Sequence, residues 1–585
     1  MTVAFTRDST LGTVLDHADA AVVVRRFAPG VVNSPLLVQL RSAPLGLVIG
    51  MDPLLKTDPA REASFWSALG AVDDSGVAAP RPERVAVVPR DDYDDAPRAS
   101  ARLRAAAPGT VQAVCEIVVD GPSHGNPFVD VEFSAEFRLG DLAVRTGGFY
   151  DGDGVYRARF LPREAGVWSV TVSSSARSLD GLSGTVVVEA ALPEAHGPVR
   201  VADTFHFAHE DGTRHVPLGT TAYAWTHQGE ALEEATLATL AESPFTKVRM
   251  CVFPKAYLYN TNEPELYPFS RGADGEWDVD RPEPAFFRHL EERVADLAAL
   301  GIQADLILFH AYDRWGFSDM GRAADDLFTR YVVRRLAAHP NVWWSLANEY
   351  DLLWSKSVDD WERLAAIVVA EDPVGHLLSI HNCFGFYDYT RPWITHASVQ
   401  RIDVYRTAEN TDAWREEWGK PVVIDECAYE GDIDQGWGNI TGEEMTRRFW
   451  EGAVRGGYVG HGETYLNDRE ELWWSKGGEL IGDSPARIAF LRRLTAEMPG
   501  GRIDPLPSDW DAPWGGSGSV QLVYFGFNRP SFRTIVRDPA DEWIVDVVDT
   551  WGMTVSRVPG TFSGSFRVEL PARQFMAIRL TKVLS

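Results

Sequence analysis

The chain has few cysteines and little positive charge. Its four cysteines, Cys115, Cys251, Cys383 and Cys427, are scattered without metal-ligand spacing, which disfavours a disulfide framework and favours reduced thiols. The 585 residues carry a net charge of −28, and no cluster of Lys and Arg interrupts this negative field. Such a field would repel a polyphosphate backbone or an anionic lipid surface, so neither nucleic acid nor membrane is an expected partner.

The hydropathy pattern shows neither a long hydrophobic run nor the pattern of a secretory leader. Residues 1–8 contain no basic region followed by an apolar core, and no later run has the length needed to span a bilayer. We therefore expect a cytoplasmic protein that acts as a monomer or a homo-oligomer.

The chain is too long for a single hydrophobic core. Residues 1–72 read as short helices, with Thr10 and Asp58-Pro59 as start signals, and predict a small helical domain whose role as a lid or a dimerisation element stays open. Residues 73–108 are rich in Asp, Pro, Arg and Ala with little periodicity, which predicts a linker.

The spacing of apolar residues changes twice in the rest of the chain. Residues 109–195 and 504–585 alternate with the two-residue period of β-sandwiches, whereas residues 196–503 alternate strand-like with helix-like segments, as parallel βαβ units do. The expected fold class is α/β, a (β/α)8 TIM barrel flanked by β-sandwich domains, with the small helical domain at the N-terminus. The predicted barrel strands are His215–Trp225, Phe245–Phe253, Ala304–His310, Val342–Glu349, Leu377–His381, Ala397–Gln400, Pro421–Glu426 and Tyr458–Tyr465.

Two of these strands end in a carboxylate. The fourth ends in Asn348-Glu349 and the seventh in Glu426. Because the C-terminal ends of the strands of a parallel barrel face the active-site mouth, the two carboxyl groups are expected over one site. Glycosidic bond cleavage needs such a pair, one group to protonate the leaving oxygen and one to attack the anomeric carbon. The structural alternative is that each Glu pairs with a barrel Arg or caps a helix.

This pattern resembles the retaining glycoside hydrolases of clan A. The β modules on both sides resemble the apiosidase-like branch, in which an N-terminal immunoglobulin-like module, here residues 109–195, and a C-terminal β module bracket the barrel. The resemblance implies that Glu426 is the nucleophile and Glu349 the acid/base, that a covalent glycosyl-enzyme intermediate forms, and that no metal or organic cofactor is needed.

Other strand ends offer candidates for binding a carbohydrate substrate. Asn348 is expected to donate to the sugar 2-hydroxyl, and the resemblance implies an Arg beside the nucleophile. The sixth strand departs from the commoner clan pattern of Tyr or His and offers Gln400, with Tyr405 beyond it. A buried core histidine or a Trp that only seals the barrel is the alternative reading of several candidates. The substrate-binding candidates are Asn348, Arg249, His310, His381, Gln400, His461, Glu463 and Trp474.

Aromatic residues near Glu349 in the sequence are expected to keep this acid neutral, namely Trp343, Trp344, Tyr350 and Trp354. The expected activity is exo-hydrolysis of small glycosides or imported oligosaccharides. A transglycosylase that uses the same two glutamates and a non-catalytic carbohydrate-binding protein are the alternatives. The sugar and its linkage stay open.

Overall fold

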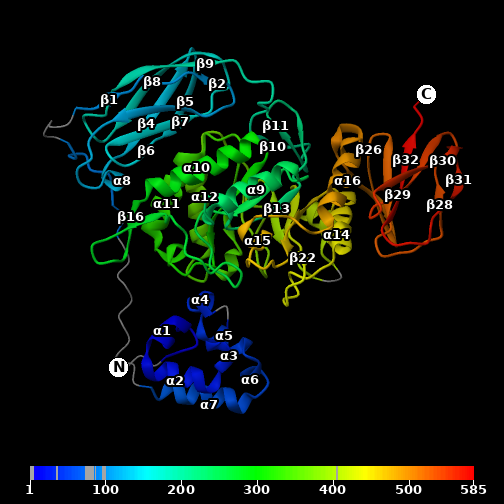
Figure 1. The fold of residues 1–585 in the computed structure, drawn as a ribbon, viewed down its shortest axis with the longest axis horizontal. Helices are drawn as coiled ribbons and strands as arrows, with labels where there is room; N and C mark the ends of the chain where they lie inside the picture. Colours follow the sequence, from blue (N-terminus) through cyan, green and yellow to red (C-terminus); the bar gives the residue numbers. More distant parts are fainter. Residues whose placement is uncertain are drawn as a thin grey trace.

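The computed structural model describes residues 5–34, 37–72, 85, 87–94, 100–403 and 406–584. Figure 1 shows a central barrel between two β domains, with a helical domain set beside the barrel. Much of the predicted linker 73–108 lies outside the described residues.

The first domain consists of short helices around an apolar core of their own. Thr10 accepts a hydrogen bond from the backbone N–H of Thr13 at the start of the first helix, and Asp58 accepts two at the start of the last. These caps satisfy donors that a helix start leaves unpaired. Trp354, from the barrel loop after Glu349, packs against the core of this domain. The described helices are α1 (Leu11–Asp16), α2 (Ala18–Phe27), α3 (Pro29–Val32), α4 (Leu37–Leu40), α5 (Leu45–Met51), α6 (Pro53–Lys56) and α7 (Pro59–Gly70).

The second domain is a sandwich of two sheets. Along its longest strand, Gly166–Ser174, buried and exposed residues alternate, so one face of the strand enters the core. Phe137 and Phe160 stack in that core with ring centroids 4.0 Å apart. Arg159 joins the domain to the barrel through an ion pair of 2.8 Å with Glu291. One sheet contains β1 (Arg102–Leu103), β3 (Cys115–Asp120), β7 (Val155–Phe160) and β6 (Phe149–Tyr150), and the other β2 (Gly109–Thr110), β9 (Ser183–Glu189), β8 (Gly166–Ser174), β4 (Phe133–Leu139) and β5 (Leu142–Gly147).

Eight parallel strands form the central sheet, which is the (β/α)8 barrel predicted from the sequence. Their order around the barrel is β19-β18-β17-β14-β13-β23-β21-β20, and a bridge between His381 and Ser398 brings the two edge strands together. Strands such as β17 and β18 are buried along their whole length because helices cover the outside. The strands are β13 (Gly219–Thr221), β14 (Lys247–Cys251), β17 (Gln303–His310), β18 (Val342–Asn348), β19 (Leu378–Ser379), β20 (Ala397–Gln400), β21 (Val422–Glu426) and β23 (Tyr458–His461).

Several of the helices between these strands are amphipathic and begin at a residue whose side chain accepts a backbone N–H. α12 begins with a capping box in which Ser357 and Asp360 bond each other's backbone N–H groups. In the described chain no helix joins β19 to β20, and an irregular loop makes this connection. The longer barrel helices are α9 (Glu230–Glu242), α10 (Pro284–Ala299), α11 (Arg322–Leu336), α12 (Val358–Glu371), α13 (Thr411–Trp418), α14 (Gly442–Val454) and α16 (Ser484–Ala496).

A small sheet closes the end of the barrel where the strands begin. It consists of β10 (Val199–Ala202), β11 (His206–His209) and β12 (Arg214–His215). Phe207 on β11 packs against Trp343, with ring centroids 5.1 Å apart, and shares a buried cluster with Val423. Both partners lie near the starts of their strands, so this end is sealed and the opposite end carries the polar side chains described below.

The C-terminal domain is a β-sandwich packed on the barrel. Trp450 on α14 stacks on Tyr524 with ring centroids 5.6 Å apart, and both belong to the barrel's buried core. Its larger sheet contains β25 (Asp504–Asp509), β26 (Ala512–Ser517), β27 (Val520–Tyr524), β32 (Met576–Lys582), β29 (Trp543–Asp549) and β30 (Thr554–Phe562), and the smaller sheet β28 (Phe532–Val536) and β31 (Ser565–Glu569).

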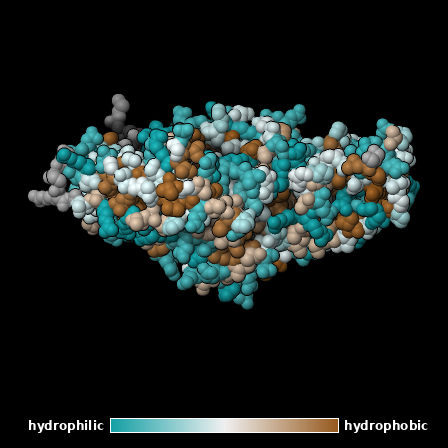
Figure 2. All heavy atoms as spheres, turned by 90° about the horizontal axis from the view of Figure 1, so that it is seen from above, coloured by the Kyte–Doolittle hydropathy of each residue, from teal (hydrophilic) through white to brown (hydrophobic). Residues whose placement is uncertain are grey.

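Hydrophilic and hydrophobic side chains are interspersed on the face seen in Figure 2. Among the described helices, none combines the length and the apolar character that crossing a bilayer requires.

Candidate active site

The two predicted carboxylates lie at the C-terminal ends of their strands. Glu426 is the last residue of β21, and Glu349 directly follows β18. Glu349 has a left-handed φ of 54°, which non-glycine residues rarely adopt and which is concentrated at functional sites. The two residues are only 5% and 7% exposed, so both carboxyl groups are largely removed from solvent.

The surroundings of Glu349 favour its protonated form. Burial raises its pKa most, and the negative charge of Glu426 raises it further, to about 7. The hydroxyl of Tyr312 donates a hydrogen bond to the Glu349 carboxyl group and opposes this rise. The group is therefore an acid that can lose its proton near neutral pH.

Glu426 is held in its ionised form by its neighbours. Burial would raise its pKa, but a contact with His381, the charge of Arg249 and a hydrogen bond from Tyr223 outweigh burial and hold the pKa at about 2. His381 Nε2 lies 3.3 Å from Glu426 Oε1, and its Nδ1 lies 3.0 Å from Ser398 Oγ. Two buried carboxyl groups in one site thus have opposite protonation states.

A layer of paired charges lies inside the barrel beside these groups. Lys247 Nζ is 2.5 Å from Asp305 Oδ2 and 2.6 Å from Asp425 Oδ1. Arg249, two residues further along β14, lies 3.7 Å from Asp425 Oδ2 and donates to Asn348 Oδ1 at 2.7 Å. These contacts fix the Arg249 guanidinium, which helps to keep Glu426 ionised.

Asn348 is oriented by contacts to its side-chain oxygen. Arg249 donates to this oxygen, and the Tyr223 hydroxyl, whose proton goes to Glu426, lies 3.1 Å from it. Because the oxygen takes both contacts, the two N–H donors of the amide remain for another acceptor, as the expected contact with a sugar hydroxyl requires.

Aromatic rings surround a buried lysine next to the carboxylates. The Lys255 ammonium lies 3.5 Å from the ring centroid of Tyr223, 4.3 Å from that of Tyr312 and 4.4 Å from that of Trp474. The hydroxyls of Tyr223 and Tyr312 reach Glu426 and Glu349 respectively. The structure therefore places Trp474 in the same group as the two carboxylates.

Two other candidates lie in the barrel wall. Gln400 is in register with Glu426 on the neighbouring strand, and its side-chain oxygen is buried without a partner among the described residues. His310 is fully buried, its Nε2 lies 3.2 Å from the backbone oxygen of Phe253, and burial lowers its pKa to about 3. The described hydrogen bonds of the His310 ring go to backbone atoms of Phe253 and Tyr312. Tyr405, the other candidate near the sixth strand, lies outside the described residues.

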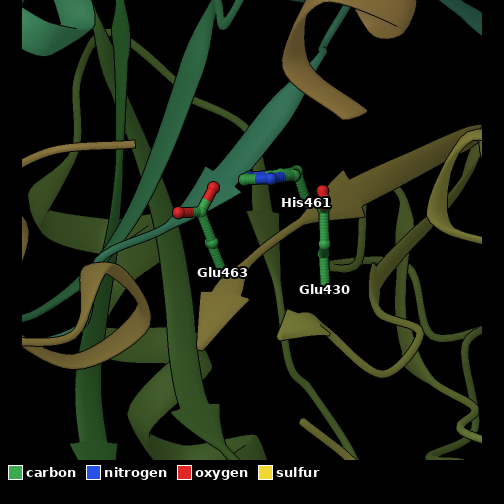
Figure 3. Close-up of side chains that lie close together, drawn as sticks. All are labelled: Glu430, His461 and Glu463. Carbon is green, nitrogen blue, oxygen red and sulfur yellow. The ribbon is translucent and has the colours of Figure 1, made fainter. Parts of the chain in front are cut away.

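His461 and Glu463 lie in a separate cluster with Glu430, shown in Figure 3. The paired short strands β22 (Glu430–Gly431) and β24 (Glu463–Thr464) place the two glutamates side by side. Each carboxylate accepts two backbone N–H groups from residues 481–484. In the described chain the three side chains offer ligand atoms within 4.8 Å of one another, the spacing of a metal site. Since both carboxylates already bind the loop, we assign the cluster to holding residues 481–484.

The expectation about the aromatic residues next to Glu349 in sequence is wrong for three of them. Trp343 packs against the sealing sheet at the other end of the barrel, Trp344 donates to Asp372, and Trp354 packs against the helical domain. Trp344 points out of the barrel because successive side chains of a strand point to opposite faces, whereas Trp343 faces inward but lies at the start of β18.

Several site residues were missed in the sequence. Lys247, Asp305 and Asp425 are charged residues inside otherwise apolar strands, which is a signal for an inward-facing polar position. Tyr223 and Tyr312 follow the ends of β13 and β17, and nothing in the local pattern distinguishes them from other loop aromatics.

Comparisons with known proteins agree with this geometry. Residues 202–477 match the apiosidase-like catalytic domain, and residues 110–175 and 510–581 match two domains of unknown function, DUF5060 and DUF5605. No curated protein matches the chain.

Solved structures give the same result. A protein from Bacteroides vulgatus ATCC 8482, provisionally assigned as a glycoside hydrolase, is 38% identical, covers 81% of this chain and 99% of its own, and superposes with a TM-score of 0.77. A glycoside hydrolase family 5 protein from the same organism shares the fold at 16% identity and a TM-score of 0.53, covering 67% of this chain and 95% of its own. The chain therefore belongs to the apiosidase-like glycoside hydrolases of clan A.

Proposed function

We propose that the protein is a retaining glycoside hydrolase in which Glu426 is the nucleophile and Glu349 the acid/base. The observation that carries the proposal is the opposite displacement of two buried carboxyl groups, with a pKa of about 7 for Glu349 and about 2 for Glu426. A retaining enzyme needs this combination, because one group must give up a proton while the other attacks as an anion.

The two steps follow from these protonation states. The Glu426 carboxylate attacks the anomeric carbon, and the bond to the leaving oxygen breaks as Glu349 protonates that oxygen. Glu349, now ionised, takes a proton from water while the water oxygen attacks the anomeric carbon and releases Glu426. After the first step Glu426 is a neutral ester, so the charge that raised the pKa of Glu349 is gone, its pKa falls, and Glu349 stays ionised and available as the general base.

The surrounding side chains support binding of a sugar. The Asn348 amide donors, the unpartnered Gln400 oxygen and the buried Trp474 Nε1, which also lacks a partner among the described residues, suit sugar hydroxyls. Trp474 further offers an indole face for the C–H groups of a sugar ring. The depth of the carboxylates favours exo-action on a terminal residue, because a polymer groove would leave them more exposed.

Assays with aryl glycosides test the proposal. Glu426→Gln should lower kcat by at least about 10³-fold on every substrate, whereas Glu349→Ala should keep its first step on substrates with good leaving groups such as 2,4-dinitrophenolate. Azide should rescue Glu349→Ala by forming a glycosyl azide of retained configuration. Glu451→Gln changes a buried glutamate outside the site and should remain active.

Proton NMR of the first-formed anomer then separates the mechanisms. Retention is expected, and an inverted product excludes Glu426 as a nucleophile. Full activity of Glu426→Gln would show that the pair is not catalytic. Product transfer to an added alcohol in preference to water would identify a transglycosylase, the alternative that uses the same residues.

A further inference from the structure

Lys255 differs from Lys247 and Arg249 in the barrel interior because no anion among the described residues forms an ion pair with it. Lys247 contacts two aspartates within 2.6 Å, and Arg249 lies near one of them. Lys255 is equally buried, at 2% exposure, yet its ammonium makes no ion pair or hydrogen bond with any residue that the structure describes. Buried lysines are rarely left this way, because an unpaired charge removed from water is costly.

The aromatic rings around Lys255 compensate part of this cost. Three ring faces lie within 4.4 Å of the ammonium, and the negative face of each ring attracts the positive charge. Burial still lowers the Lys255 pKa to about 8, more than the charges of Glu349 and Glu426 offset. The ammonium is therefore charged at neutral pH but incompletely stabilised, and a nearby anion would lower its free energy.

The position of Lys255 shows where that anion would sit. Two of its rings belong to Tyr223 and Tyr312, whose hydroxyls contact the proposed nucleophile and acid/base. The third belongs to Trp474, whose buried indole N–H lacks an acceptor among the described residues. A charged donor and a neutral donor thus lie together beside the carboxylates, where the sugar that is cleaved from its leaving group must bind.

We propose that Lys255 and Trp474 bind a carboxylate carried by this sugar, so that the preferred substrates are glycosides of uronic acids. The proposal rests on the proposed function and extends it to a substrate class. Lys255 supplies the charge that balances the carboxylate, and Trp474 Nε1 supplies a directional hydrogen bond. Neutral sugars place a hydroxymethyl group or a hydrogen in this position and leave the ammonium unpaired.

A matched substrate panel tests the inference. We would compare 4-nitrophenyl glucuronides and galacturonides of both anomers with the corresponding glucosides and galactosides, using wild type, Lys255→Met, Lys476→Met and Glu426→Gln. Lys255→Met keeps the length of the stem and removes the charge, and Lys476→Met is the control on α15 (Trp473–Lys476) beside the site. A charge-assisted contact of about 2–3 kcal/mol corresponds to a 30- to 150-fold change.

The expected result is a uronide preference in kcat/KM of at least about 30-fold in wild type and in Lys476→Met, and a preference close to one in Lys255→Met. Equal loss on both classes, or preference for neutral glycosides, would overturn the inference while Glu426→Gln still abolishes turnover. Turnover by Glu426→Gln would instead overturn the proposed function.

Binding provides a second readout that needs no turnover. Tryptophan fluorescence of Glu426→Gln titrated with free glucuronate, galacturonate, glucose and galactose should show saturable binding of a uronate and much weaker binding of its neutral parent. Absence of uronate binding, or uronate binding that Lys255→Met leaves unchanged, counts against Lys255 as the carboxylate site.

Discussion

The hydrogen bond between Tyr312 and Glu349 makes a quantitative prediction about pH dependence. Tyr312 donates to the Glu349 carboxyl group and so favours its ionised form. Tyr312→Phe removes the donor and keeps the ring that packs on Lys255. Without the donor the ionised form is less stable, so the Glu349 pKa must rise from its value of about 7.

The magnitude follows from the energy of a hydrogen bond to a charged group, about 1.5–3 kcal/mol. At about 1.4 kcal/mol for each pKa unit, the pKa of Glu349 should reach roughly 8–9. The acid/base must be protonated for the first step, so the fall in kcat/KM at high pH should move upward by about 1–2 units. Glu426, with a pKa of about 2, stays ionised above pH 5, so no change is expected at the low end of the profile.

The assay is kcat/KM against pH from 5 to 10 on one aryl glycoside. Tyr257→Phe is the matched control, because Tyr257 packs against Tyr312 with ring centroids 5.2 Å apart and makes no side-chain hydrogen bond to Glu349 in the described structure. The shift should persist in a Lys255→Met background, which removes the ionisation of that lysine near pH 8. A high-pH limb that is unchanged, or moves downward, would refute this account of Glu349.

Two further predictions concern stability and close packing. Burial raises the folded-state pKa of Glu463 to about 7 from 4.5, so the unfolded chain loses this proton at lower pH than the folded chain, and the free energy of unfolding should fall by about 3 kcal/mol between pH 4.5 and 7. Urea unfolding at pH 5 and pH 8 should show this loss in wild type and a smaller loss in Glu463→Gln. An equal loss in both proteins would contradict the prediction. A Cβ at Gly460 would lie 2.6 Å from a backbone oxygen of β21, so Gly460→Ala should displace that strand and lower kcat at least tenfold. Gly436→Ala is the control and should leave kcat unchanged, because the space around its Cβ position is open. A fully active Gly460→Ala enzyme would show that β21 can shift without moving the nucleophile.

The sequence contained enough to predict the barrel and its two carboxylates. The spacing of apolar residues within each segment indicates whether it is a strand or a helix and which face is buried, and this spacing can be read from neighbouring residues alone. The position of Glu349 and Glu426 at strand ends is local as well, and topology alone carries both to one end of a parallel barrel.

The sequence did not determine the direction of individual side chains. His461 and Glu463 sit on the eighth strand and its extension, as predicted, yet they lie in a cluster with Glu430 that binds the 481–484 loop. Trp343 and Trp344 precede Asn348-Glu349 on the same strand, yet Trp343 packs against the sealing sheet at the start of the strand and Trp344 donates to Asp372. Along a strand, a shift of one residue places a side chain on the opposite face of the sheet.

The sequence by itself therefore determined the architecture, the family resemblance and the two strand-end glutamates, since these depend on periodicity and on residue type at strand ends. Only the tertiary structure decided what surrounds them: the donors on Glu426, the hydrogen bond on Glu349 and the position of the Lys255 ammonium among three rings. These contacts join residues more than 30 positions apart in sequence, and the protonation states they set depend on burial and distance, which no local pattern encodes.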